Sequence, residues 1–118
     1  MTDFLKTIKY DDFAKLDLRI ATVKKAEFHP NADRLLKLQI DDGTPEGRQI
    51  CAGMKDWYKP EELEGTQVVI IANLEPRKIR GEMSDGMVVA ATRRNGEDAE
   101  DVAVLRVDRE MPSGAKVS

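Results

Sequence analysis

Short runs that alternate apolar and polar residues predict a chain built mainly of strands. From residue 17 to residue 28, Leu18 and Ile20 face one way and Arg19 the other, a period of two that is typical of a strand. The segment 67–74 (QVVIIANL) is almost entirely apolar and rich in β-branched residues, which predicts a central, buried strand. Further strands are expected over 35–40, 48–52, 86–92 and 102–107.

Two interruptions of this pattern predict short helices. Residues 10–16 (YDDFAKL) place carboxylates where they favour a helix N-terminus, and residues 53–64 predict a short, interrupted helix across a barrel end. The remaining polar segments are turn or loop sequences. They are HPNAD (29–33), the hairpin sequence DDGTPEG (41–47), the loop 76–87, the polar turn RNGEDAED (94–101) and an irregular C-terminus (111–118).

The order of these elements predicts the fold class. Three strands, a short helix and two more strands are the order of an OB-fold, a five-stranded Greek-key barrel with a helix between its third and fourth strands. We therefore expect an all-β protein with a short helix and small N- and C-terminal extensions. A length of 118 residues suits one domain, 1–118, with its core over 13–107.

Composition narrows the cellular setting. Hydrophobic residues make up 41% of the chain and charged residues 35%, enough for both a core and a soluble surface. No apolar run approaches the roughly 18 residues that a membrane span needs, and the N-terminus lacks the apolar region of a signal peptide. Cys51 is the only cysteine, so no intrachain disulfide can form. These features predict a cytoplasmic protein without a membrane partner.

The stretch 76–87 (PRKIRGEMSDGM) carries the main functional signal. The whole chain has a net charge of −3, yet residues 73–94 hold five basic residues against three acidic ones. Arg77, Lys78 and Arg80 lie close together on the expected loop. Arginine forms bidentate contacts with phosphate and lysine acts as a point charge, so these residues predict a polyanionic partner. The alternative interpretation is an ordinary solvated loop.

Several segments together resemble a known family. They are FAKLDLRIATV, HPNADRLLKLQID, RQICAG and YKPEELEGTQVVIIANLEPRKIRGEMSDGMVVAA, about two-thirds of the chain. They resemble the tRNA-binding OB domain found at the C-terminus of many methionyl-tRNA synthetases and as free-standing proteins. The start IKYDDF is most similar to the free-standing archaeal form, the β subunit. The resemblance implies tRNA as partner, a homodimer, and a methionyl-tRNA synthetase catalytic chain as a further partner.

Four more residues are candidate tRNA contacts. Ser84 and Met87 belong to the family's S-x-G-M motif, where a hydroxyl can reach phosphate or ribose and a thioether can contact a base; alternatively both are structural. Asn73 ends a predicted strand, and its amide could bind RNA or fix the backbone. Lys37 lies on the strand that usually forms the OB ligand face, or simply points outward.

The aromatic content predicts how RNA is recognised. The chain has one Trp, two Tyr and three Phe, and of these only Phe28 lies in a predicted strand. OB proteins that hold single strands stack bases on several aromatic side chains, so we expect recognition of folded RNA shape and backbone instead.

Catalysis and metal binding find little support in the sequence. The chain has no catalytic triad and no phosphate-binding loop motif, so we expect no enzyme activity and no cofactor. A zinc site needs three or four ligands, whereas this chain has one His and one Cys; His29 is expected to serve the turn. The alternative functions are a dimeric, peptide-binding, secretion-chaperone-like protein and, with less support, a signalling role.

Overall fold

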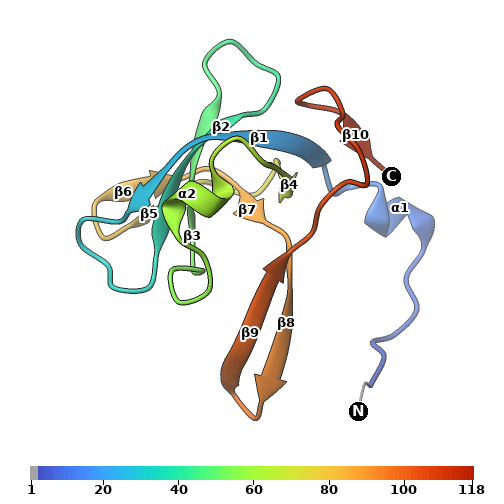
Figure 1. The fold of residues 1–118 in the computed structure, drawn as a ribbon. Helices are drawn as coiled ribbons and strands as arrows, with labels where there is room; N and C mark the ends of the chain where they lie inside the picture. Colours follow the sequence, from blue (N-terminus) through green and yellow to red (C-terminus); the bar gives the residue numbers. More distant parts are fainter. Residues whose placement is uncertain (1–2) are drawn as a thin grey trace.

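A nearly closed antiparallel barrel of five strands forms the centre of the molecule (Figure 1). The structure is a computed structural model that describes residues 3–118. Its elements, in chain order, are α1 (Tyr10–Phe13), β1 (Leu18–Phe28), β2 (Leu36–Asp41), β3 (Arg48–Ala52), α2 (Pro60–Leu63), β4 (Gln67–Ile71), β5 (Arg77–Ile79), β6 (Glu82–Ser84), β7 (Met87–Val88), β8 (Ala90–Asn95), β9 (Asp98–Val104) and β10 (Lys116–Val117).

The strand order in the barrel is β3-β2-β1-β4-β7. Strand β1 pairs with β4 along its first half and with β2 along its second, and a register shift between Val23 and Lys25 separates the two halves. Such a bulge bends a strand and lets a sheet curl. The end strand β3 approaches the segment just before β7, the other end strand, where the Asp85 amide donates to the Gln49 carbonyl at 2.8 Å. The predicted OB-type barrel is confirmed.

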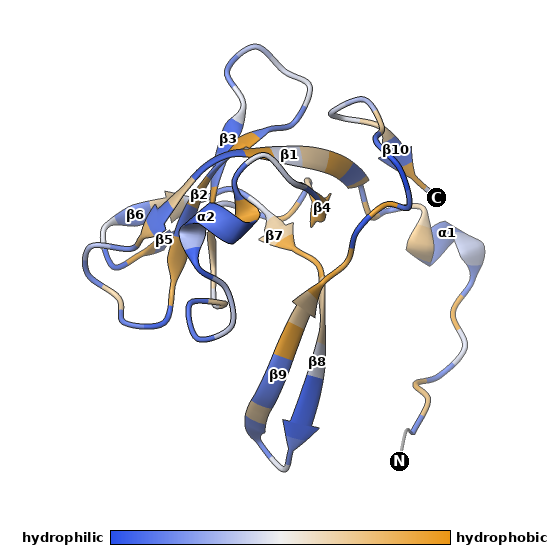
Figure 2. Ribbon diagram, in the orientation of Figure 1, coloured by the Kyte–Doolittle hydropathy of each residue, from blue (hydrophilic) through white to orange (hydrophobic). Residues whose placement is uncertain are grey.

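Apolar side chains from four strands and α2 fill the barrel. The largest fully buried ones are Leu36, Leu38, Ile40, Ile50, Leu63, Ile70, Val23 and Val68. Figure 2 shows how hydrophobic positions concentrate in the barrel strands, while the far end of the β8–β9 hairpin is hydrophilic. Leu63 anchors α2 in the core, which confirms the predicted short helix. Both helices described over residues 3–118 have four residues, too few to cross a membrane.

The stretch 76–87 is a β-hairpin, not the loop that the sequence predicts. Strands β5 and β6 pair from Arg77↔Ser84 to Ile79↔Glu82, and Arg80 and Gly81 form the two-residue turn between them. Both turn residues have positive φ, 50° for Arg80 and 89° for Gly81. Two-residue hairpin turns favour Asn-Gly at such positions, so an arginine there hides the signal.

Two further predictions fail in the C-terminal third. The expected polar turn 94–101 is mostly strand, because β8 reaches Asn95 and β9 begins at Asp98. Both strands are exposed here, so no apolar alternation marks them. The expected strand 86–92 divides at Val89, where the chain leaves the barrel and enters the β8–β9 hairpin (Figure 1).

The C-terminal segment is mostly irregular, as expected, but it contains one short strand. Strand β10 pairs with the start of β1, Leu18 opposite Val117. The Gly114 amide donates to the Ile20 carbonyl at 2.7 Å, and the Ile20 amide donates to the Ala115 carbonyl at 2.8 Å. A strand of two residues whose partners lie so far away in the sequence gives no local pattern of apolar and polar residues that could predict it. The main sheet thus includes residues beyond Val107, the end of the expected core.

Candidate nucleic-acid interface

The three candidate cations of the β5–β6 hairpin point in different directions. Side chains alternate between the faces of a strand, so Arg77 and Ile79 share one face and Lys78 takes the other. Opposite them, Ser84 is buried beside Arg77, whereas Met83, opposite Lys78, is 47% exposed. The first face is therefore turned toward the barrel and Lys78 faces outward. Arg80 occupies the turn at the hairpin tip.

The hairpin tip is braced by the HPNAD segment. Nε2 of buried His29 donates to the Ile79 carbonyl at 2.8 Å, while its Nδ1 accepts from the Asn31 amide. The Asn31 side chain donates to the Arg80 carbonyl at 3.1 Å. A loop that follows β1 thus holds the backbone of the residue that carries the tip charge. His29 has the structural role that the sequence predicts.

The return strand of the hairpin is tied to the edge of β3. The Gln49 side chain donates to the Met83 carbonyl at 2.8 Å, and the Ser84 hydroxyl accepts from the Cys51 amide at 2.9 Å. These bonds satisfy an edge strand that would otherwise expose unpaired backbone groups. Ser84 is 5% exposed, so its side chain presents almost no surface to a partner. Its position favours the structural alternative for this residue.

Lys37 also bridges the hairpin and the barrel. Its Nζ lies 3.4 Å from carboxylate oxygens of both Glu27 and Glu82. Partial burial by itself lowers the pKa of Lys37, but the two carboxylates more than offset this, so the net pKa is raised. The cation is already neutralised within the fold. This environment favours a role in holding β6 over direct contact with RNA.

A groove of about 500 Å³ runs between the hairpin and the barrel. Its walls combine Arg77 and Glu75 with apolar side chains, and Met87 is 47% exposed along it. Gly86 lies at the floor with a φ of +118°, and a Cβ there would come within 2.8 Å of the Ile71 carbonyl. The residues that line the groove are Cys51, Leu74, Glu75, Arg77, Ile79, Ser84, Gly86 and Met87.

Asn73 fixes the backbone just before the hairpin. Its Oδ1 accepts from the Asp17 amide at 2.9 Å and its Nδ2 donates to the Lys15 carbonyl at 2.7 Å. Both amide ends thus bind the segment that leads from α1 into β1. Of the two roles considered for Asn73, the geometry favours fixing the backbone over binding RNA.

Arg48 is a structural residue that sequence reasoning missed. Its Nε donates to Asp42 at 2.7 Å, and its Nη1 donates to the carbonyls of Ala72 at 2.8 Å and Asp85 at 3.2 Å. Burial by itself raises the pKa of Asp42, but a hydrogen bond from Thr44 and the Arg48 guanidinium lower it to about 2. Arg48 therefore clamps both ends of the segment that carries the hairpin. A single arginine in a short strand gives no local signal of such contacts.

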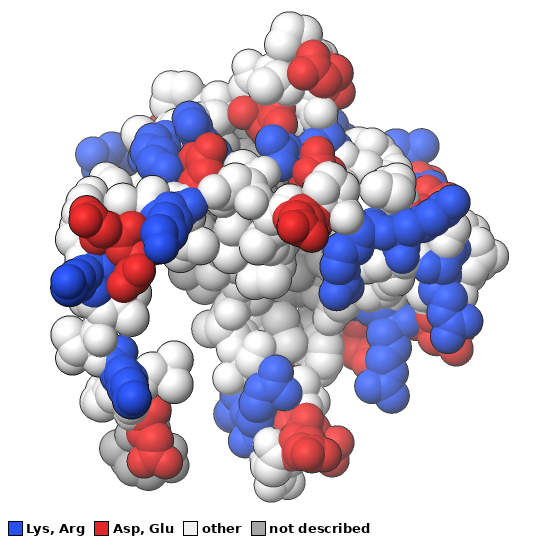
Figure 3. Space-filling view, turned by 180° about the vertical axis from the view of Figure 1, so that it is seen from behind, with Lys and Arg blue, Asp and Glu red and all other residues white. Residues whose placement is uncertain are grey.

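The hairpin cations are free to meet a partner. None of the ion pairs found among residues 3–118 involves Arg77, Lys78 or Arg80. Figure 3, seen from behind, shows Lys and Arg side chains along the side of the molecule where β5 and β6 lie. No group of three His, Cys, Asp or Glu side chains suited to a metal occurs within the described residues.

Comparisons with known proteins identify the family of this chain. A family model described as "Putative tRNA binding domain" matches residues 18–116. The methionine–tRNA ligase of Thermococcus kodakarensis is 50% identical over 113 residues, 96% of this chain, and that of Pyrococcus abyssi is 50% identical over 110 residues. The chain spans only 14% of the length of these two relatives.

Two solved structures have the same fold along almost the whole chain. A methionyl-tRNA synthetase-related protein from Pyrococcus horikoshii is 37% identical with a TM-score of 0.86, covering 97% of this chain and 100% of its own. The chaperone CsaA from Bacillus anthracis is 34% identical with a TM-score of 0.83, covering 96% of this chain and 100% of its own. Because the family model covers most of its length, the chain belongs to the tRNA-binding domain family.

Proposed function

We propose that this chain binds folded tRNA through the β5–β6 hairpin and the groove behind it. The observation that carries the proposal is a braced hairpin whose three cations have no partner within residues 3–118, although the chain is acidic overall. Cations held on a rigid frame lose little entropy on meeting phosphates, and phosphate contacts position an RNA without reading its sequence.

The candidate residues divide into two roles in this proposal. Arg77, Lys78, Arg80 and Met87 contact the RNA, because each is exposed on the hairpin or along the groove. Ser84, Asn73 and Lys37 hold the contacting segment in place, because each is engaged by hydrogen bonds or ion pairs within the fold.

The biological role that we propose is accessory. The chain acts as a β subunit or as a trans-acting module that tethers tRNA for a methionyl-tRNA synthetase catalytic chain in the cytoplasm, without chemistry of its own. The family match and the methionine–tRNA ligase relatives support this role. Titration of a synthetase catalytic chain with this protein should lower its KM for tRNA; an unchanged KM would contradict the accessory role.

A homodimer is part of the same proposal. Apolar side chains of the N-terminal segment are exposed in the single chain, including Phe4 at 93% and Leu5 at 94%. A second copy would cover such surface, and two sites on one rigid body would raise avidity for tRNA. Sedimentation velocity should then give twice the mass of one chain, and a monomer at micromolar concentration would contradict it.

The test of the binding site is a triple substitution, Arg77→Ala, Lys78→Ala and Arg80→Ala. We expect tRNA affinity to fall by at least about tenfold. The slope of log K against log salt concentration should decrease in magnitude by about two to three, because binding releases about one counterion fewer for each phosphate contact that is lost. Filter binding across a salt series measures both, with circular dichroism to confirm folding.

The matched control removes three exposed cations elsewhere, Lys15, Lys24 and Arg109. It changes the net charge equally and should leave most of the affinity. Equal losses in the two variants would mean that only overall charge matters. Unchanged affinity in the hairpin variant would move the site elsewhere.

Peptide binding is the second candidate function. The CsaA similarity and the apolar part of the groove, including Leu74, Ile79 and Met87, favour it. A labelled unfolded peptide should bind more weakly than tRNA if our first proposal holds. Tight peptide binding that tRNA does not displace would favour the chaperone-like alternative.

A further inference from the structure

One exposed aromatic side chain of the barrel has no role in the core. Phe28 is the last residue of β1 and is 56% exposed. A single exposed apolar side chain is common on protein surfaces and says little by itself. The neighbours of this ring are what set it apart.

One cation, Lys55, lies over the Phe28 ring, and its backbone is hydrogen-bonded to that of a second, Arg34. Nζ of Lys55 lies 5.2 Å from the ring centroid, within the range of a cation–π contact. The Lys55 amide also donates to the Arg34 carbonyl at 3.4 Å, which brings the two segments together. Asp33 and Asp56 are their chain neighbours, yet none of the ion pairs within residues 3–118 involves Arg34 or Lys55.

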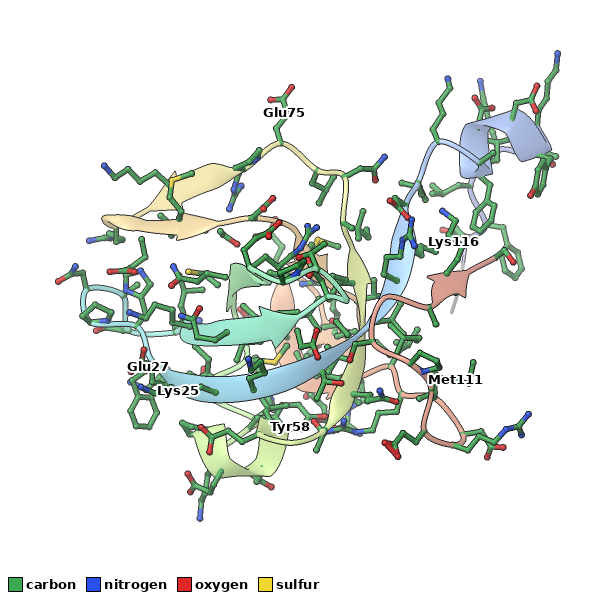
Figure 4. The ribbon with its side chains drawn as sticks, turned by 90° about the horizontal axis from the view of Figure 1, so that it is seen from above. Lys25, Glu27, Tyr58, Glu75, Met111 and Lys116 are labelled. Carbon is green, nitrogen blue, oxygen red and sulfur yellow. The ribbon has the colours of Figure 1, made fainter. Side chains whose placement is uncertain are left out.

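This cluster is connected to the proposed tRNA site by the loop that follows β1. Phe28 directly precedes His29, whose ring is bonded to the Ile79 carbonyl of the hairpin, and Asn31 is bonded to Arg80. In Figure 4, Lys25 and Glu27 mark this end of β1, on the same side of the molecule as the β5–β6 hairpin and away from Met111 and Lys116. The ring and the hairpin tip are thus joined through one short, hydrogen-bonded loop.

We propose that Phe28, Lys55 and Arg34 form a stacking site for one unpaired nucleotide of the tRNA held by the hairpin; the inference rests on the proposed function. A base can stack on the exposed ring while the two cations bind its phosphates. Folded RNA offers unpaired bases in its loops and at its ends, and aromatic side chains recognise bases there. One ring accommodates one base, which suits a protein that recognises RNA mainly by shape.

The experiment compares tRNA binding by Phe28→Ala, Phe28→Leu and Phe28→Trp. Stacking predicts a loss of about fivefold or more for the alanine and leucine variants, and near wild-type affinity for tryptophan. The salt slope should stay unchanged in Phe28→Leu, because no charge is lost, and should fall by about one in Lys55→Ala. Leucine keeps an apolar side chain of similar size but has no aromatic ring. A loss of affinity in this variant therefore reports lost stacking and not lost packing or a folding defect.

Met111→Ala is the control, since it removes an exposed apolar side chain on the side of the molecule away from Lys25 and Glu27 (Figure 4). It should bind as the wild type does. Wild-type affinity in Phe28→Leu would overturn the stacking site while leaving the proposed function intact. Failure of the wild-type chain to bind tRNA would instead overturn the proposed function, and the inference with it.

Discussion

Ser84 and Met87 belong to one short motif but have opposite environments. The Ser84 side chain is buried and accepts a hydrogen bond from Cys51 of β3, whereas Met87 opens β7 with 47% of its surface exposed. Gly86 between them permits a backbone conformation that a Cβ would obstruct. One motif therefore combines a structural anchor, a tight backbone approach and an exposed apolar contact.

We predict that Ser84→Ala lowers stability and leaves tRNA affinity nearly unchanged. The substitution removes the hydroxyl that accepts a hydrogen bond from the Cys51 backbone amide. That amide then has no acceptor, which lowers the free energy of unfolding by about 1–3 kcal/mol. Chemical denaturation measures the stability and filter binding the affinity. Met83→Ala, on the exposed face of the same strand, should change stability by less than about 0.5 kcal/mol. A loss of affinity without a loss of stability would place the Ser84 hydroxyl on the RNA.

The β5–β6 hairpin carries a conformational cost at its tip. Arg80 has a φ of 50°, a left-handed conformation that costs a residue with a side chain about 1 kcal/mol. Asparagine tolerates this conformation better and favours the first position of such a turn. The arginine therefore places a charge at the tip at the expense of stability, as is common at functional sites.

We predict that Arg80→Asn raises the free energy of unfolding by about 0.5–1 kcal/mol and lowers tRNA affinity. The variant relieves the turn but removes a proposed phosphate contact, so the two effects should have opposite signs. Thermal unfolding and filter binding provide the two measurements. Lys78→Asn, in the strand next to the turn, should lower affinity without a gain in stability. If Arg80→Asn were less stable than the wild type, the strain at the tip would not exist.

Elements with local signals could be predicted, and elements without them could not. Strand β3 falls on the expected residues, β1 begins one residue later than expected, and β2 is shifted by one residue. The β5–β6 hairpin escaped prediction because its turn contains an untypical residue. Strand β10 escaped because it is held by pairing with β1, about a hundred residues earlier. Local patterns carry no information about such pairings.

At the scale of the whole molecule, the same limit applies to the site. The three hairpin cations could be singled out as candidates because charge stands out in an acidic chain. The hydrogen bonds of His29 and Asn73 could not, because their partners lie 50 and 56 or more residues away. The roles of candidate polar side chains in this fold therefore depend on which distant segments the barrel brings together.

Arg48 and Asp42 connect the stability of the barrel to the position of the hairpin. Arg48 joins the β2–β3 turn, through Asp42, to the carbonyls that flank the hairpin segment at Ala72 and Asp85. Protonation of Asp42 removes the charge that orients the guanidinium. Loss of this clamp should loosen both the barrel closure and the site.

The pKa of Asp42 gives this clamp a defined pH range. Its pKa in the folded chain is about 2, below the ordinary value of 3.8, so folding favours the carboxylate. The stabilisation is therefore complete above about pH 4 and is lost as the pH falls through 2, with a magnitude of at most about 2.5 kcal/mol. Asp17, whose pKa is lowered by hydrogen bonding to Arg19, adds acid sensitivity in the same direction.

We predict that Asp42→Asn destabilises the protein at pH 6 but brings it close to the wild type at pH 2. The difference in unfolding free energy between the two proteins isolates Asp42, because Asp17 and the other carboxylates titrate in both. Urea denaturation at half-unit steps from pH 6 to pH 2 measures it. The gap should shrink as the pH drops below about 4. A gap that stays constant over this range would mean that Asp42 contributes through its shape and hydrogen bonds alone, and that its charge does not hold the clamp.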